Sequence, residues 1–177
     1  MNLVGLIKNT KTPFSLDFGV GDIVIPAPII RLLPVLLSGF EKPEILTYSL
    51  ESVIAEKFDA ILSRMNHTSR MKNFYDIYYL ASTVDFEGRS LQEALFETLQ
   101  NRGTPYERNS LELVALLSSD IDMMHRWNTF CRKVIKQELD FNDVLSVIVN
   151  LLELPFGAIL NESEFFGKWN AEGKKYK

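Results

Sequence analysis

The chain has 177 residues, of which 46% are hydrophobic, enough for one well-buried core with a small appendage. Its formal net charge of −4 and pI near 5.3 argue against a general nucleic-acid-binding surface, although they allow a local basic pocket. The single cysteine, Cys131, excludes an internal disulfide and fits a reducing compartment. Two histidines far apart in the sequence argue against a histidine-based zinc site.

The N-terminus carries the strand-like content of the chain. Residues 3–7, 14–18 and 22–25 are expected as strands, and Gly19 and Gly21 predict a hairpin turn between the second and third, which Asp22 would serve. Three short strands make a poor independent sheet, so we expect one small curled sheet with one face covered by helices. A proline-rich connector follows over residues 26–43.

Residues 48–65 read as an amphipathic helix that carries charge in its apolar stripe. Apolar residues recur there at steps of three and four, whereas Lys57 and Glu51 fall inside or at the edge of the same stripe. An unpaired buried ammonium costs several kcal/mol, so Lys57 needs a carboxylate partner, a route to water along its stem, or an anionic ligand. The route to water is the commonest of these three.

Residues 70–84 form a second predicted helix, in which Lys72 and Asp76 are four apart and can pair. If the two helices pack antiparallel across the short link 66–69, the basic residues Arg64 and Arg70 converge with Lys72, Lys57 and Asp76. Such a group suits an anionic substrate, because phosphate oxygens accept hydrogen bonds from arginine and lysine. A solvated charged face is the commoner explanation for basic clusters of this kind.

The rest of the chain is predicted to be helical over residues 90–101, a short segment capped by Asn109 or Ser110, 121–135, and 142–154 ended by Pro155. The tail, residues 165–177, is expected to be frayed. No segment reaches the length of about 18 apolar residues that a membrane span needs, and no signal peptide is evident, so we expect a cytoplasmic protein. The fold class is α+β: a β-containing part over residues 1–47, packed on a helical part over residues 48–177, as one continuous unit.

Three segments in order, PFSLDFGVGD, TYSLESVIAEKFDAILSR and SRMKNFYDIYYL, resemble the AbiEii/AbiGii toxin family of nucleotidyltransferase-like proteins over about residues 14–80. The resemblance implies a polymerase-β-like nucleotidyltransferase core with a helical second lobe. It also implies a toxin of type IV toxin–antitoxin and phage-abortive systems, with a cognate antitoxin. The implied reaction transfers a nucleoside monophosphate from a nucleoside triphosphate, with Mg²⁺, to a hydroxyl of tRNA, another RNA or a protein.

The resemblance also assigns roles to residues of this chain. Asp17 resembles a metal-binding carboxylate on a strand, Lys57 a phosphate-binding helix lysine, and Asp76 the acidic residue of the last motif, which would act as a base or orient Lys72. These three are the expected catalytic residues. The basic residues Arg64, Arg70 and Lys72 would bind substrate.

One departure from the family pattern affects the expected activity. No glycine-serine turn followed by paired aspartates precedes Asp17, and two-metal phosphoryl transfer needs several carboxylates. We therefore expect a truncated or divergent member whose catalysis is incomplete in this chain. The alternative is a non-catalytic interaction or antitoxin-like module, whose exposed apolar patch a homodimer would cover.

Overall fold

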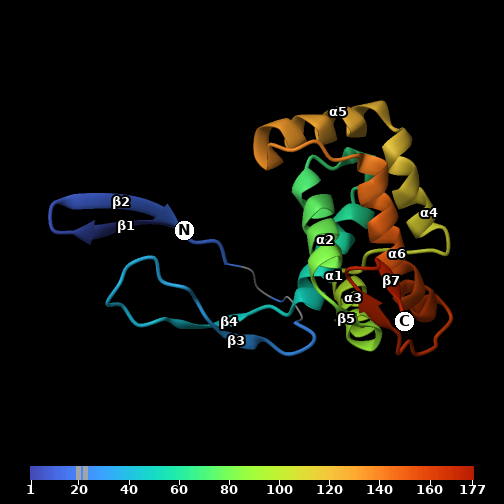
Figure 1. Ribbon diagram of the computed structural model, residues 1–177, viewed down its shortest axis with the longest axis horizontal. Helices are drawn as coiled ribbons and strands as arrows, with labels where there is room; N and C mark the ends of the chain where they lie inside the picture. The colour runs from blue at the N-terminus through green and yellow to red at the C-terminus, as the bar shows by residue number, and fades with distance from the viewer. Residues whose placement is uncertain (19–20, 22–23) are drawn as a thin grey trace.

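The structure, a computed structural model, describes residues 1–18, 21 and 24–177 (Figure 1). It confirms an α+β fold in which small antiparallel sheets accompany a larger set of helices. The helices gather into one bundle, and the N-terminal strands extend from one side of it (Figure 1).

The first hairpin joins β1 (Asn2–Ile7) to β2 (Thr10–Ser15) through a two-residue turn in which Lys8 has a φ of 54°. The predicted strand over residues 3–7 is confirmed. The predicted pairing of the second strand with residues 22–25 falls partly on residues outside the described ranges; among the described residues, β2 pairs with β1 through the tight turn after β1. Gly19, Asp22 and residue 23 lie outside the described residues, and Val24 and Ile25 are not in a strand.

A second hairpin lies inside the segment expected as a connector. It pairs β3 (Ile29–Leu32) with β4 (Glu44–Thr47), and it shares no strand with the first hairpin. The expectation of a single curled sheet is therefore wrong. Most residues of β1 to β4 are exposed, so neither hairpin has an apolar face fully covered by helices.

The described helices begin at Leu50 and alternate with short turns and one small sheet. Their bounds are α1 (Leu50–Leu62), a 3-10 turn (Met65–His67), α2 (Met71–Thr83), α3 (Gly88–Arg102), α4 (Ser110–Ala115), a second 3-10 turn (Leu116–Ser119), α5 (Ile121–Phe130), a π-helical turn (Cys131–Ile135) and α6 (Phe141–Leu160). The predicted end of α3 is confirmed: Gly103 takes the left-handed conformation, with a φ of 63°, that glycine adopts without strain.

Helix α6 passes through the centre of the bundle and packs against α2, α3 and α4. Its predicted end before Pro155 is wrong: the helix continues to Leu160, because the cost of one lost backbone hydrogen bond is offset by burying Phe156 and Ile159. By length and composition α6 could cross a membrane, which corrects the expectation that no segment reaches that length. Since 56% of its apolar window is buried inside the bundle, its hydropathy fits a core helix and is weak evidence for a membrane span.

The C-terminal tail is ordered, so the prediction of a frayed end is wrong. Strands β6 (Lys168–Asn170) and β7 (Lys175–Tyr176) form a small antiparallel sheet with β5 (Phe86–Glu87). The Trp169 side chain is fully buried and its ring N–H donates to the Ala81 carbonyl at 2.7 Å. The Tyr176 hydroxyl donates to the Leu151 carbonyl, and burial raises its pKa. The tail thus closes one side of the core.

Replacing Trp169 by alanine should lower the free energy of unfolding by about 3–5 kcal/mol, because it opens a cavity and leaves the Ala81 carbonyl without its donor. Urea denaturation followed by circular dichroism measures the change. The control is Phe166→Ala in the same tail, where the ring is 71% exposed; that variant should be nearly as stable as the parent chain. Equal stability of both variants would contradict the ordered tail.

Candidate functional site

Helix α1 begins at a well-formed cap and turns one face into the core. The Ser49 hydroxyl accepts a hydrogen bond from the Ser52 N–H at 3.1 Å, which satisfies one of the free donors in the first turn. The buried face of the helix carries Ile54, Phe58 and Ile61. Lys57 lies beside this face and turns its ammonium toward α2.

Lys57 forms an ion pair with Asp76 on α2, with 2.6 Å between Nζ and Oδ2. The two side chains are 22% and 17% exposed, so the pair is sheltered without being buried. Of the three possibilities open to Lys57, the structure shows a carboxylate partner. A charge-assisted hydrogen bond in such a position contributes about 1.5–3 kcal/mol.

Lys72 binds the same carboxylate from the solvent side. Its Nζ lies 2.6 Å from Oδ2 and 2.8 Å from Oδ1 of Asp76, and its side chain is 69% exposed. An exposed pair four residues apart contributes only about 0.3–0.5 kcal/mol. Two ammonium groups thus meet one carboxylate oxygen, which leaves a local excess of positive charge at the edge of α1 and α2. We call Lys57, Lys72 and Asp76 the two-lysine cluster.

Arg64 and Arg70 do not join the two-lysine cluster. Both are exposed and flank the link between the helices, and neither forms an ion pair with any described residue. Arg64 is seven residues beyond Lys57 and so lies about 10 Å further along the helix direction. The link itself is held by Arg126, whose guanidinium donates to the carbonyls of Asn66 and Thr68 at 2.8 Å each.

Asp17 stands apart from the other candidate residues. It is exposed and lies two residues after the end of β2, so it is not on the strand where the sequence placed it. It forms no hydrogen bond or ion pair with another residue in the described ranges. The predicted group of six residues is therefore brought together only in part, as Lys57, Lys72 and Asp76.

The described residues do not fit a magnesium site. Magnesium needs several oxygen ligands in near-octahedral geometry, whereas Asp17 offers one exposed carboxylate. Within residues 1–18, 21 and 24–177, no three side chains of histidine, cysteine, aspartate or glutamate lie together in a way that could hold a metal ion.

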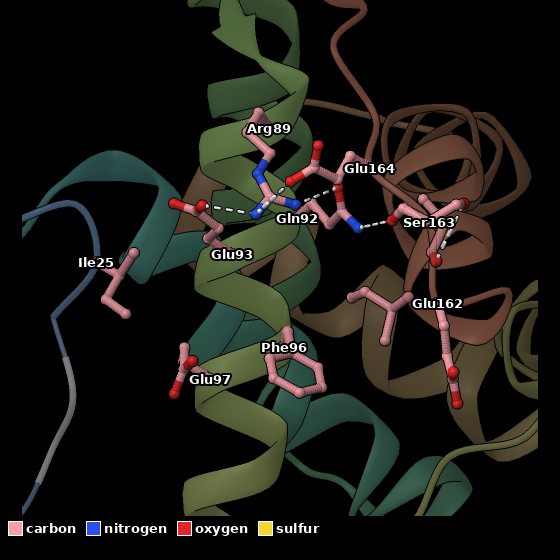
Figure 2. A pocket seen from close by; sticks show the side chains of 11 residues that line it. Ile25, Arg89, Gln92, Glu93, Phe96, Glu97, Glu162, Ser163 and Glu164 are labelled. Carbon is pink, nitrogen blue, oxygen red and sulfur yellow. Dashed lines mark hydrogen bonds and ion pairs between the residues drawn. The ribbon is translucent and has the colours of Figure 1, made fainter.

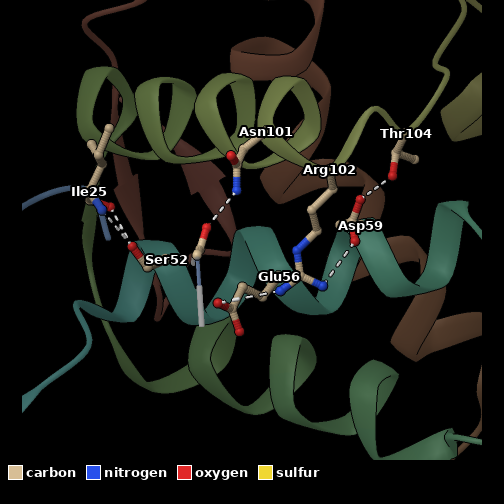
Figure 3. A network of polar contacts seen from close by, with 8 residues as sticks. Ile25, Ser52, Glu56, Asp59, Asn101, Arg102 and Thr104 are labelled. Atoms are coloured by element: carbon tan, nitrogen blue, oxygen red, sulfur yellow. Dashed lines mark hydrogen bonds and ion pairs between the residues drawn. The ribbon is translucent and has the colours of Figure 1, made fainter. Parts of the chain in front are cut away.

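A second polar network lies on the α3 side of α1 and was not predicted from the sequence (Figure 3). Asp59 is only 4% exposed, accepts a short hydrogen bond from the Thr104 hydroxyl, and lies 3.4 Å from Nη1 of Arg102. Nη2 of the same guanidinium lies 3.6 Å from Glu56. One signal was available, because Asp59 shares a helical face with Ala55 and Leu62 and a carboxylate there requires partners.

The same side of α1 anchors the N-terminal segment (Figure 3). The Ile25 N–H donates to the Ser52 hydroxyl at 2.8 Å, and the hydroxyls of Ser49 and Ser52 both donate to the Ile25 carbonyl. Asn101 on α3 donates to the Gly21 carbonyl at 2.9 Å. These contacts attach the segment between the hairpins to the bundle. We call the described residues that precede Ser49 the N-terminal arm, and its base is thus held in place.

A cavity of about 440 Å³ lies between α3 and the end of α6, close to Ile25 (Figure 2). Arg89 at its rim pairs with Glu93 at 3.0 Å and with Glu164 at 3.2 Å. Glu97 and Glu162 also line it, which gives a surplus of negative charge. A triphosphate would be repelled there, so the cavity does not suit an anionic nucleotide.

Asp59→Ala should lower the free energy of unfolding by about 2–3 kcal/mol, because it leaves Arg102 and Thr104 without a sheltered acceptor. Thermal and urea denaturation measure the change. Glu153→Ala, at an exposed position of α6, is the control and should change stability by less than about 0.5 kcal/mol. Combining Asp59→Ala with Thr104→Val should cost less than the two single changes together, since both remove the same bond. Strict additivity would contradict the contact.

Comparison with protein families gives a match to most of the chain. A family model described as "Nucleotidyl transferase AbiEii toxin, Type IV TA system" matches residues 4–147. No curated protein and no solved structure gives a significant match. The match covers most of the first hairpin, the second hairpin, the two-lysine cluster and most of the helical bundle. The chain therefore belongs to the AbiEii nucleotidyl transferase toxin family of type IV toxin–antitoxin systems.

Proposed function

We propose that the chain binds the triphosphate of a nucleotide at the two-lysine cluster. The reaction that it serves is transfer of a nucleoside monophosphate to a hydroxyl of an RNA, such as tRNA, or of a protein. The supporting observation is that Lys57 and Lys72 both place an ammonium 2.6 Å from Oδ2 of Asp76. The pair of cations is thus held close together at a surface position that an anion can reach.

Each member of the cluster has a separate role in this proposal. Lys57 is sheltered and held by the bundle, so it supplies a fixed positive charge for phosphate oxygens. Lys72 is exposed and can move toward the ligand. Asp76 orients both ammonium groups before the ligand arrives, which lowers the ordering cost of binding. Arg64, about two helical turns beyond Lys57, and Arg70, two residues before Lys72, would contact the remainder of the nucleotide or the acceptor.

The chemical step is incomplete with the described residues alone. Asp17 is the one candidate metal-binding carboxylate, and it follows β2, whereas the cluster lies on α1 and α2. Nucleotide binding and group transfer are therefore separate parts of the proposal. Binding depends on α1 and α2, whereas transfer also depends on carboxylates that complete the Asp17 site. We place this activity in the cytoplasm, where nucleoside triphosphates and tRNA are present.

A second candidate function is supported by the surface of the arm. Ile7 is 75% exposed, Leu46 is 70% exposed and Leu36 is fully exposed, far more apolar exposure than the bundle shows over a comparable length. Exposed apolar surface of this kind marks a binding surface for another chain. Membership of a type IV family implies a cognate antitoxin, and phage defence is the cellular role that we propose for the pair.

Lys57→Ala should weaken binding of nucleoside triphosphates at least about tenfold, because it removes the sheltered ammonium. Isothermal titration calorimetry with each of the four triphosphates measures this. Lys133→Ala, an exposed lysine near α5, is the matched control and should bind like the parent chain. Equal affinity in Lys57→Ala and in the parent would contradict the site, as would no binding at about 1 mM triphosphate.

Transfer is tested separately from binding. The chain is incubated with labelled triphosphates, magnesium and total tRNA, and the label on RNA and on protein is measured. Transfer that is lost in both Asp17→Ala and Lys57→Ala would support an enzyme. Binding without transfer under all of these conditions would favour the interaction module.

A further inference from the structure

The first hairpin has two edges, and its hydrogen bonds show which backbone groups face outward. Leu16 and Met1 exchange both backbone bonds, with the Leu16 N–H to the Met1 carbonyl at 2.8 Å. Bonded and non-bonded pairs alternate along an antiparallel ladder. The N–H and C=O groups of Asn2, Val4 and Leu6 therefore point away from β2, along the outer edge of β1.

The outer edge of β2 is blocked, whereas the outer edge of β1 is open. Pro13 lies opposite Val4, at a non-bonded position where its nitrogen faces outward and has no proton to donate. A strand added beside β2 would lose that bond. Strand β1 contains no proline and no charged residue, which are the features that usually protect an edge.

The outer edge of β1 is exposed to solvent. Val4 is 58% exposed and Leu6 is 66% exposed. No hydrogen bond joins the outward backbone groups of Asn2, Val4 or Leu6 to another described residue. An isolated two-stranded hairpin is only marginally stable in water, so a further strand on this edge would stabilise it.

We propose that β1 pairs antiparallel with β1 of a second copy of this chain, about a two-fold axis at Val4. In this register Val4 faces Val4 of the other copy and Leu6 faces Asn2, so no like charges oppose one another. About six new backbone hydrogen bonds would form between the outward groups. The product is a sheet in the order β2–β1–β1–β2 across the two copies.

Two features favour a second copy in this arrangement over an open stack of strands. The assembly closes at two chains, because Pro13 blocks both outer edges of the new sheet. Lys8 lies in the turn of the hairpin and Lys11 lies near it in β2. Antiparallel pairing places the two turns at opposite ends, more than about 20 Å apart. Parallel in-register stacking would bring these lysines together. The inference is independent of nucleotide binding.

The test uses two prolines placed opposite each other in the same hairpin. Leu6 and Lys11 form a non-bonded pair, so proline at either position removes only an outward N–H. Sedimentation velocity should show a dimer for the parent chain and a dimer dissociation constant at least about tenfold higher for Leu6→Pro. Lys11→Pro, on the edge that Pro13 already blocks, should dimerise like the parent.

A charge exchange at the axis tests the register. Val4→Lys should be monomeric, because two ammonium groups would face each other. Val4→Asp should also be monomeric, because two carboxylates would face each other. Mixing the two variants should restore dimers that contain one chain of each. Circular dichroism checks that every variant keeps its helical bundle.

Several results would overturn the proposal. A parent chain that is monomeric at about 100 μM would contradict the dimer. A dimer that persists in Leu6→Pro, or in Val4→Lys alone, would contradict the pairing through β1. Hydrogen exchange gives an independent reading, since the Val4 and Leu6 amides should be protected in the dimer. Protection of these amides in a monomer would mean that the chain covers its own edge, which also contradicts the proposal.

Discussion

Helix α1 determines how the bundle is assembled, because it carries polar contacts on two sides of a buried apolar face. Toward α2, Lys57 meets Asp76; toward α3, Asp59 meets Arg102 and Thr104. Each of these contacts shelters a charge that would be costly to leave without a partner. The neighbouring helices can therefore adopt few other rotations relative to α1, and the position of the two-lysine cluster follows from this constraint.

The helical bundle and the N-terminal arm differ in how far they bury their apolar side chains. The bundle buries its largest side chains, including Trp127, Trp169 and Phe58, in one continuous core. The hairpins of the N-terminal arm bury few of theirs. Hydrogen bonds from Ser49, Ser52 and Asn101 hold the base of the arm, but its strands remain open to other chains. The nucleotide binding and the self-association that we propose thus lie in different parts of one molecule.

The family match includes both the candidate site and Asp17, but these lie on different elements of the chain. Residues 4–147 match the AbiEii family, and the two-lysine cluster lies within that match. The cluster offers positive charge for an anion, whereas the described residues offer no grouped carboxylates for a metal. In the function that we propose, the helices therefore carry nucleotide binding, whereas group transfer also depends on the arm.

The sequence by itself determined the local features of the chain. The period of the apolar residues predicted α1 and α2, Gly103 predicted the end of α3, and the spacing of Lys72 and Asp76 predicted their contact. Each of these depends on residues within a few positions of one another, where helix geometry sets the distances.

Tertiary structure decided the features that depend on distant segments. Trp169 is buried against α2 and not frayed, α6 continues past Pro155 because the core surrounds it, and the expected connector contains the β3–β4 hairpin. The partner of Asp59 comes from residues more than 40 positions away. In each case the stabilising free energy comes from burial and from pairing between segments that are distant in the sequence. The spacing of residues within one segment cannot predict such a contact.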